Sequence, residues 1–319
     1  MADLPASRVT TDTKPFSICG IDYAGPFNLR ESKRRGNIPV SKAYAAVFVC
    51  FKTKAVHLEL VSSLTTEAFL STFRRFCARR RTCIHMYSDN GTTLVGAANE
   101  LKEIYEFLKA QETCIATRLA AQNIKWHFIP PRSPHFGGLW EAAVKSVKRY
   151  LRITMKNLIY TFEEYYTLLV EIEGILNSRP LTTLSSDPND LTPLTPAHFL
   201  MGGALIMPVE KNLLDVKDTH LSRWQHIQKL RQHYWQRWHK EYLQQLQVRT
   251  KWKEGDDAVQ VRDLVLLIEE NLPPMQWKLG RIEALHPGED GVVRVATIRT
   301  STGSFKRAVK KICALPYKN

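Results

Sequence analysis

The stretch WHFIPPRSPHFGGLWEAAVKSVKRY, residues 126–150, decides the fold of this chain. Its first four residues are typical of a buried strand, and the two prolines that follow predict a break into a Gly-rich loop. That loop opens a helix whose first turn carries Glu141. A single carboxylate is therefore expected at the start of a helix, shortly after a strand.

Two stripes run along the predicted helix. One carries a carboxylate followed by three cations at positions i, i+4, i+7 and i+11: Glu141, Lys145, Lys148 and Arg152. The adjacent stripe is apolar and able to face a core: Trp140, Val144, Val147 and Leu151. An ordinary amphipathic helix with a solvated polar face has the same pattern, so the rest of the chain must distinguish it from a site.

The composition favours a globular protein with an anionic partner. A chain of 319 residues with 44% hydrophobic content is long enough for two packed domains. Lys and Arg outnumber Asp and Glu by 45 to 31, which gives a net charge of +14. A charge of this size favours nucleic acid as the partner, although a merely basic surface would give the same number.

The cysteines and the apolar runs bear on the compartment. The six cysteines are scattered without a C-x-x-C pair, which argues against a zinc knuckle and against a secreted disulfide framework. No apolar run approaches the roughly 20 residues that span a bilayer, and the N-terminus lacks the apolar part of a signal peptide. We expect a reducing, intracellular setting and no membrane role.

The first half of the chain alternates strands with helices. Residues 16–23 predict a strand that ends at the turn Ala24-Gly25-Pro26, with Asp22 near its end. Residues 44–51 are apolar on both faces, and residues 55–61 alternate, so three strands in succession suggest an antiparallel meander. A helix follows from Thr65 or Thr66, and then a strand that closes on Asp89-Asn90-Gly91. Asp89 would lie at a strand tip, where a turn-forming acid is also common.

The second half contains a linker and a smaller β unit. We expect residues 1–14 to be a connector, 15–180 the first domain, 181–220 a Pro-rich extended linker, and 221–319 a long helix followed by a small barrel. Five short β runs in the last part support that barrel: residues 259–261, 264–268, 280–284, 292–299 and 305–309. Residues 221–319 carry more than half of the net charge, but an SH3-like barrel can bind protein as well as DNA.

Three acids share a common type of position. Asp22 and Asp89 each end a predicted strand, and Glu141 begins a helix after another strand. If they meet on one rim of a mixed sheet, they repel one another unless a divalent metal neutralises them, and their hard oxygens select Mg²⁺ or Mn²⁺. Two such ions about 3.5–4 Å apart suit phosphodiester chemistry. By spacing alone the signal is weak, because a chain with 31 acids contains many triples.

Four strings give this pattern a family resemblance: GIDYAGPF, AYAAVFVCFKTKAVHLELVSSLTTEAF, YSDNGTTLVGA and FIPPRSPHFGGLWEAAVKSVK. They resemble the catalytic core of retroviral-type integrases, specifically those of BEL/Pao long-terminal-repeat retrotransposons. The segment from residue 262 to residue 307 looks like the barrel-like module that ends such polyproteins.

The resemblance implies an RNase H-like α/β fold with a mixed five-stranded sheet, and a metal-binding and catalytic triad of Asp22, Asp89 and Glu141 that holds two Mg²⁺ or Mn²⁺ ions. Further residues follow from it in two groups. The active-site loop would contain Asn90, Gly91, Gly137 and Gly138. DNA would be bound by Lys145, Lys148, Arg152, Arg132 and His135.

The chain departs from the family pattern in two places. The family's zinc-binding module should precede residue 1, so we expect a piece of a longer polyprotein. Gly91-Thr92-Thr93-Leu94 replaces the usual Asn-Phe after the Asp-Asn-Gly turn, which affects loop packing but leaves the three acids intact.

The leading hypothesis is an enzyme that trims the 3′ ends of DNA and joins them to target DNA, acting as a homo-oligomer in the nucleus after a stage in a cytoplasmic particle. The alternatives are a nucleic-acid-binding remnant without activity and a nuclease that only hydrolyses. Metal-dependent joining separates the first hypothesis from both others, and metal-dependent nicking separates the two alternatives.

Overall fold

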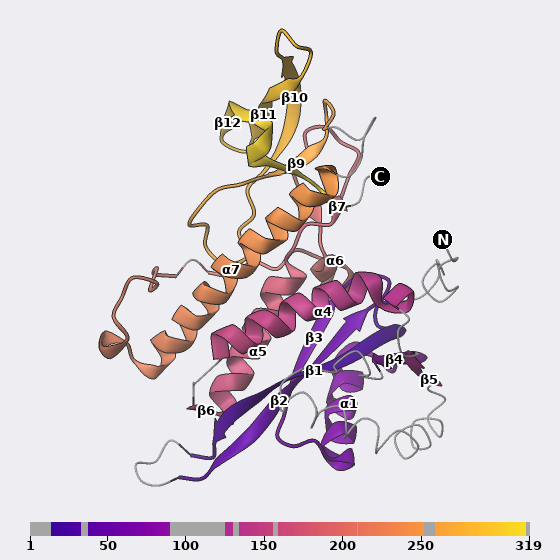
Figure 1. The fold of residues 1–319 in the computed structure, drawn as a ribbon, viewed down its shortest axis with the longest axis vertical. Coiled ribbons are helices and arrows are strands. Elements are labelled where there is room, and N and C mark those ends of the chain that lie inside the picture. Colours follow the sequence, from indigo (N-terminus) through magenta and orange to yellow (C-terminus); the bar gives the residue numbers. More distant parts are fainter. Residues whose placement is uncertain are drawn as a thin grey trace. The chain divides into compact units, whose positions relative to one another are not determined.

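The computed structural model describes the chain in seven segments: residues 14–32, 38–89, 125–129, 134–155, 159–208, 210–251 and 259–316. For some of these positions it describes only the backbone: residues 89, 126, 128, 129, 134–143, 146 and 248–251. The chain divides into two compact units, Met1–Leu176 and Asn177–Asn319, which are described separately (Figure 1). Within the described segments, no helix combines the length and the hydropathy that crossing a bilayer requires.

The first unit is built on a mixed sheet with the strand order β3-β2-β1-β4-β5. Its strands are β1 (Ile18–Arg30), β2 (Val40–Cys50), β3 (Val56–Val61), β4 (His85–Asp89) and β5 (Lys125–Ile129). β1, β2 and β3 pair antiparallel, whereas β4 runs parallel to β1 and β5 parallel to β4. The predicted meander and the predicted five-stranded mixed sheet of an RNase H-like core are both confirmed.

Helices flank this sheet, and one short strand extends it. They are α1 (Thr66–Arg80), α4 (Pro134–Met155) and α5 (Phe162–Asn177), while β6 (Ile159–Thr161) pairs with β1. Thr65 caps α1, since its hydroxyl accepts a hydrogen bond from the Ala68 N–H at 3.2 Å. The buried rings of Phe69, Phe73 and Phe76 attach the helix to the core, as their spacing predicts.

Two local predictions are wrong in this unit. The expected turn at Ala24-Gly25-Pro26 is a β-bulge, because the register with β2 shifts between Ala24 and Phe27 while β1 continues to Arg30. The expected Gly-rich loop at Gly137 and Gly138 is helical, because α4 begins already at Pro134. Proline suits the first position of a helix.

The reason for the longer α4 is visible in the sequence spacing. Phe136 lies four positions before Trp140, so the apolar stripe of the helix extends one turn further toward the N-terminus than expected. A glycine in a helix interior costs about 1 kcal/mol relative to alanine, an amount that packing of an apolar face offsets. Gly137 and Gly138 are therefore part of α4 and are not loop residues.

The second unit combines a long helix with an antiparallel sheet. α7 (Arg223–Lys251) precedes a sheet with the order β12-β11-β10-β9-β13. Its strands are β9 (Leu264–Leu267), β10 (Leu279–Pro287), β11 (Val293–Thr300), β12 (Gly303–Ala308) and β13 (Ile312–Ala314). They enclose a small apolar core around Val265, Ile282 and Ile298. The predicted C-terminal β domain is confirmed.

One of the five predicted β runs is wrong. Residues 259–261 form a turn, in which the Asp263 carboxylate accepts a hydrogen bond from the Gln260 N–H at 2.9 Å and Arg262 has a φ of 77°. The fifth strand is β13, which pairs with β9.

Residues 181–220, predicted as an extended linker, carry short elements. These are β7 (Thr182–Thr183), β8 (Pro193–Leu194), α6 (Pro196–Met201) and the 3-10 turn η3 (Asp218–His220); a second such turn, η4 (Val309–Lys311), precedes β13.

Candidate functional site

Asp22 lies on β1, the middle strand of the first sheet, and faces the point where a parallel strand ends. On one side it pairs with Val47 of β2. On the other side Ile21 pairs with Ser88 of β4, and β4 ends one residue later, at Asp89. Residues 22 and 89 thus follow directly after one pair of registered neighbours, on strands about 4.8 Å apart. The sheet brings these two sequence-predicted positions together, although Asp22 lies within its strand and not at the strand's end.

Helix α4 contacts β1 and β2 through the predicted apolar stripe, and Figure 1 shows it lying across the strands. Val144, Val147 and Leu151 are all buried, which fixes the rotation of the helix about its axis. The polar stripe is therefore carried toward the sheet at the level of Asp22.

The side chain that reaches Asp22 is Lys148. Its Nζ atom lies 2.5 Å from Oδ2 of Asp22, and the two side chains are 26% and 18% exposed. The other carboxylate oxygen, Oδ1, accepts a hydrogen bond from the Tyr23 N–H at 2.8 Å. Both oxygens of Asp22 are therefore engaged, and the group on Oδ2 is a cation.

Glu141 lies seven residues before Lys148 on the same helix face, about 10.5 Å along the axis. Because Lys148 contacts Asp22, the backbone at residue 141 belongs to the same side of the sheet. The carboxylates of Asp89 and Glu141 are outside the side chains that the structure describes. Among those that it does describe, no three His, Cys, Asp or Glu side chains form a metal-binding group.

The predicted DNA-binding cations differ in their surroundings. Lys145 and Arg152 are exposed, whereas Lys148 is partly buried against Asp22. Arg132, Asn90 and Gly91 lie outside the described residues, and of His135 only the backbone, within α4, is described. Gly137 and Gly138 belong to the first turns of α4.

A buried charged cluster was not predicted from the sequence. His57 of β3 lies between two carboxylates, with Nε2 3.1 Å from Glu59 Oε1 and Nδ1 3.0 Å from Glu173 Oε2. Arginines from α1 complete it: Arg75 and Arg79 contact Glu59 at 2.7 and 2.8 Å, and Arg80 contacts Glu173. The cluster joins β3, α1 and α5.

Burial and pairing oppose each other in this cluster. Burial lowers the pKa of His57, but its hydrogen bonds to Glu173 and Glu59 raise it, and the net shift is upward. Burial raises the pKa of both glutamates, but the bonds to His57 and the arginines lower it, and the net shift is downward. His57 is therefore held as an imidazolium between two carboxylates, which is a structural role.

A second histidine pair lies beside the end of β4. His85 Nδ1 is 2.8 Å from His127 Nε2, and the ring of His127 stacks on Tyr87 at a centroid distance of 4.6 Å. Burial, followed by the charge of Lys125 and the mutual influence of the rings, lowers the pKa of both histidines. The pair is therefore held neutral and lies two residues from Asp89 in the pairing of β4 with β5.

Comparisons with known proteins point to one group of structures and to one sequence family. The solved simian T-cell lymphotropic virus intasome in complex with PP2A regulatory subunit B56 gamma is similar with a TM-score of 0.35 and 13% identity, over 95% of this chain and 79% of that chain. The HTLV-2 integrase catalytic core domain in complex with magnesium, in a trimeric form, is similar with a TM-score of 0.32 and 17% identity, over 59% of this chain and 97% of that chain. Such low scores do not by themselves establish a shared fold, so the function is inferred below from the chain's own residues.

Residues 222–315 match a family described as "Family of unknown function (DUF5641)", which covers α7 and the second sheet. No curated protein matches the chain in sequence.

Proposed function

We propose that this chain is the integrase of a BEL/Pao-type long-terminal-repeat retrotransposon, a divalent-metal-dependent enzyme that trims DNA 3′ ends and joins them to target DNA. Two lines of evidence support the proposal. The first is the set of sequence motifs that resemble this family. The second is the sheet, whose strand order brings residues 22 and 89 side by side and whose helix α4 carries residue 141 on the same side.

The observation that carries the proposal is the ion pair between Asp22 and Lys148. An aspartate with 18% of its side chain exposed has a cation 2.5 Å from one oxygen, so this position on β1 holds positive charge next to a carboxylate. An ammonium group is a plausible stand-in for a metal ion at such a carboxylate, because both neutralise the same charge. The donor set of Asp22, Asp89 and Glu141 consists only of hard oxygens, which suits Mg²⁺ or Mn²⁺.

The roles of the residues follow from this arrangement. Asp22, Asp89 and Glu141 would hold the metal, which when bound would activate the attacking oxygen and stabilise the leaving oxygen. Lys148, once displaced from Asp22, is free to contact a DNA phosphate. Lys145 and Arg152 are exposed on the same helix stripe and would bind phosphates along the strand.

We further propose that DNA ends and target DNA are the substrates, that the active form is a homo-oligomer, and that it acts in the nucleus, where the target DNA lies. The net charge of +14 supports a polyanionic substrate. These points extend the proposal beyond the fold and rest on the resemblance.

Strand-transfer assays test the proposal. The parent chain and Asp22→Asn are incubated with Mg²⁺ or Mn²⁺, duplexes that carry the element's ends, and a supercoiled plasmid. We expect the parent to join the ends to the plasmid and Asp22→Asn to be slower by at least about a thousandfold, because metal-ion catalysis supplies several kcal/mol. Joining by Asp22→Asn at the parental rate would refute the assignment. Nicking without joining would favour a nuclease, and binding without either would favour an inactive remnant.

A further inference from the structure

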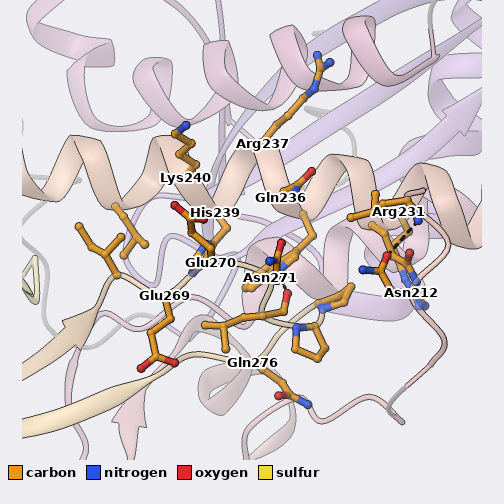
Figure 2. Close-up of a pocket in the computed structure, with 18 of the residues that line it drawn as sticks. Asn212, Arg231, Gln236, Arg237, His239, Lys240, Glu269, Glu270, Asn271 and Gln276 are labelled. Atoms are coloured by element: carbon orange, nitrogen blue, oxygen red, sulfur yellow. Dashed lines mark hydrogen bonds between the residues drawn. The ribbon is translucent and has the colours of Figure 1, made fainter. Parts of the chain in front are cut away.

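The second unit contains a groove with a volume of about 590 Å³ that no proposed activity uses. Helix α7 forms one wall, and residues 268–276 and 207–214 form the other (Figure 2). In Figure 2, Gln236, His239 and Lys240 come from the helix, while Glu269, Glu270 and Asn271 come from the opposite loop.

The groove is elongated along the helix. Its lining residues on α7 repeat at intervals of four: Arg231, Trp235, His239, Leu243 and Gln247. Sixteen residues of helix correspond to about 24 Å. Met207 and Pro208 line the end beside Arg231, so the part that remains open, from Trp235 to Gln247, is about 18 Å long.

Hydrogen bonds hold the walls in place. Trp235 donates from Nε1 to the Leu272 carbonyl at 2.7 Å, which ties α7 to the loop. Gln232 donates to the Lys211 carbonyl and accepts from the Leu213 N–H, both at 2.8 Å, which ties α7 to the other segment. The groove is therefore formed in advance of binding, and a ligand would not have to order its walls.

His239 is the polar group at the floor of this groove. It is 7% exposed, and its ring lies between Trp235 and Trp277 at centroid distances of 4.6 and 4.9 Å. Within the described residues, neither ring nitrogen has a hydrogen-bond partner. Burial lowers the pKa of His239 to about 4, so the ring is neutral near pH 7 and offers one donor and one acceptor. This pair matches the N–H and C=O of a peptide group.

The charge of the groove excludes a polyanion as its ligand. Its lining contains three acids, Glu210, Glu269 and Glu270, and three bases, Arg231, Arg237 and Lys240, so its formal charge is zero. The whole chain carries +14. Two copies of such a chain repel each other, and a neutral surface is where they can approach at the lowest electrostatic cost.

The chain itself exposes a segment with the matching chemistry. Residues 202–206, Gly-Gly-Ala-Leu-Ile, carry no charge and form no helix or strand. Ile206 is 88% exposed, the largest value among the large hydrophobic side chains that the structure describes. Five extended residues span about 17 Å, which equals the open length of the groove to within a residue.

We propose that residues 202–206 of a second copy of this chain dock in the groove along α7, with Ile206 against Trp235 and Leu243 and with a main-chain peptide group bonded to His239. Since Met207 and Pro208 continue this segment and line the end of the chain's own groove, two copies can exchange it reciprocally in a two-fold dimer.

Sedimentation of the full chain over a concentration series tests this proposal. We expect a dimer whose dissociation constant rises at least about tenfold in Ile206→Asp, because an isoleucine side chain is no longer buried. His239→Phe keeps the ring between the two tryptophans but removes both nitrogens, and should raise the constant about fivefold. Gln245→Ala changes an exposed residue of α7 outside the groove and should leave it unchanged.

A synthetic peptide of residues 202–206, acetylated and amidated, provides a second measurement that does not depend on folding of a variant. It should dissociate the dimer and change the tryptophan fluorescence of the parent, and the same peptide with aspartate in place of Ile206 should do neither. A monomeric parent, a dimer insensitive to Ile206→Asp, or equal effects of the two peptides would each overturn the proposal.

Discussion

Lys148 supplies the counter-charge of Asp22: its Nζ atom lies 2.5 Å from Oδ2, across the interface between α4 and the middle strand of the sheet. The pair makes the proposed metal site self-neutralising at one of its three carboxylates. A divalent ion that binds Asp22 through Oδ2 must displace the ammonium group, so the metal and Lys148 compete for one oxygen.

This competition predicts the effect of Lys148→Met. Without the ammonium group, Mg²⁺ no longer has to break an ion pair, so the Mg²⁺ concentration that half-saturates the protein should fall. A partly exposed pair contributes about 1 kcal/mol, which corresponds to about a fivefold decrease. Thermal unfolding recorded during a Mg²⁺ titration measures this concentration without any activity assay.

Lys145→Met is the matched control, because it removes the same charge from an exposed position on the same stripe. If Lys145→Met and Lys148→Met shifted the Mg²⁺ dependence equally, the effect would be one of net charge and the competition would be excluded.

A second prediction separates catalysis from folding on α4. Glu141→Gln removes one anionic ligand but no apolar contact, so the unfolding temperature in the absence of metal should stay the same or rise, because repulsion among the three acids is relieved. Strand transfer should collapse. Val147→Ala removes two methyl groups from a buried site and should cost about 1–3 kcal/mol, lowering stability and activity together.

Thermal unfolding and Mg²⁺-dependent joining are measured for both variants and for the parent. Parental joining by Glu141→Gln would remove Glu141 from the triad and would leave α4 as an ordinary amphipathic helix.

The comparison of sequence and structure shows where periodicity stops being informative. The spacing of Val144, Val147 and Leu151 predicts the buried face of α4, and the structure confirms it. The same spacing places Lys148 on the face of Glu141 but does not reveal Asp22 as its partner, since that contact joins residues 126 positions apart and depends on how the helix lies on the sheet.

Strand β3 illustrates the opposite case. Alternation of Val56, Leu58 and Leu60 with His57 and Glu59 predicts one solvated face, yet every residue of β3 is buried. Glu59 tolerates burial because Arg75 and Arg79 of α1 neutralise it. The basic end of α1 is visible in the sequence, but its pairing with an acid 16 and 20 residues away is a tertiary contact that no local pattern encodes.

A third prediction concerns DNA binding. Because each neutralised phosphate releases counterions, the logarithm of affinity falls by about 0.9 per phosphate for each tenfold rise in salt. The double variant Lys145→Gln/Arg152→Gln should therefore reduce the slope by about 1.8. Arg74→Gln/Arg81→Gln removes the same charge from exposed positions at α1 and should change the slope much less. Titrations of duplex DNA at several salt concentrations measure both slopes, and equal changes would mean that α4 has no special part in binding.

The last prediction is the pH dependence of the buried cluster around His57. The raised pKa of His57 means that its contribution to stability is complete below the ordinary value of 6.5 and is lost as the pH rises through the folded value. The lowered pKa values of Glu59 and Glu173 mean that their contribution is present above 4.5 and is lost as the pH falls through the folded values. The cluster therefore stabilises the first unit most between about pH 4.5 and 6.5.

Other histidines oppose this trend: burial lowers the pKa of His85, His127 and His239, so they destabilise the fold as the pH falls. The test is therefore a difference between the parent and His57→Gln, in which those contributions cancel. The parent's advantage in the free energy of urea unfolding should be largest below pH 6.5 and should shrink as the pH rises, by about 1.4 kcal/mol for each unit by which the fold raises the pKa of His57. Arg80 of α1 also faces the ring, with Nε 3.3 Å from Nδ1, and its charge lowers the pKa. Arg80→Gln, which removes that charge, should therefore move the fall to higher pH. An advantage independent of pH would show that His57 is buried in its neutral form.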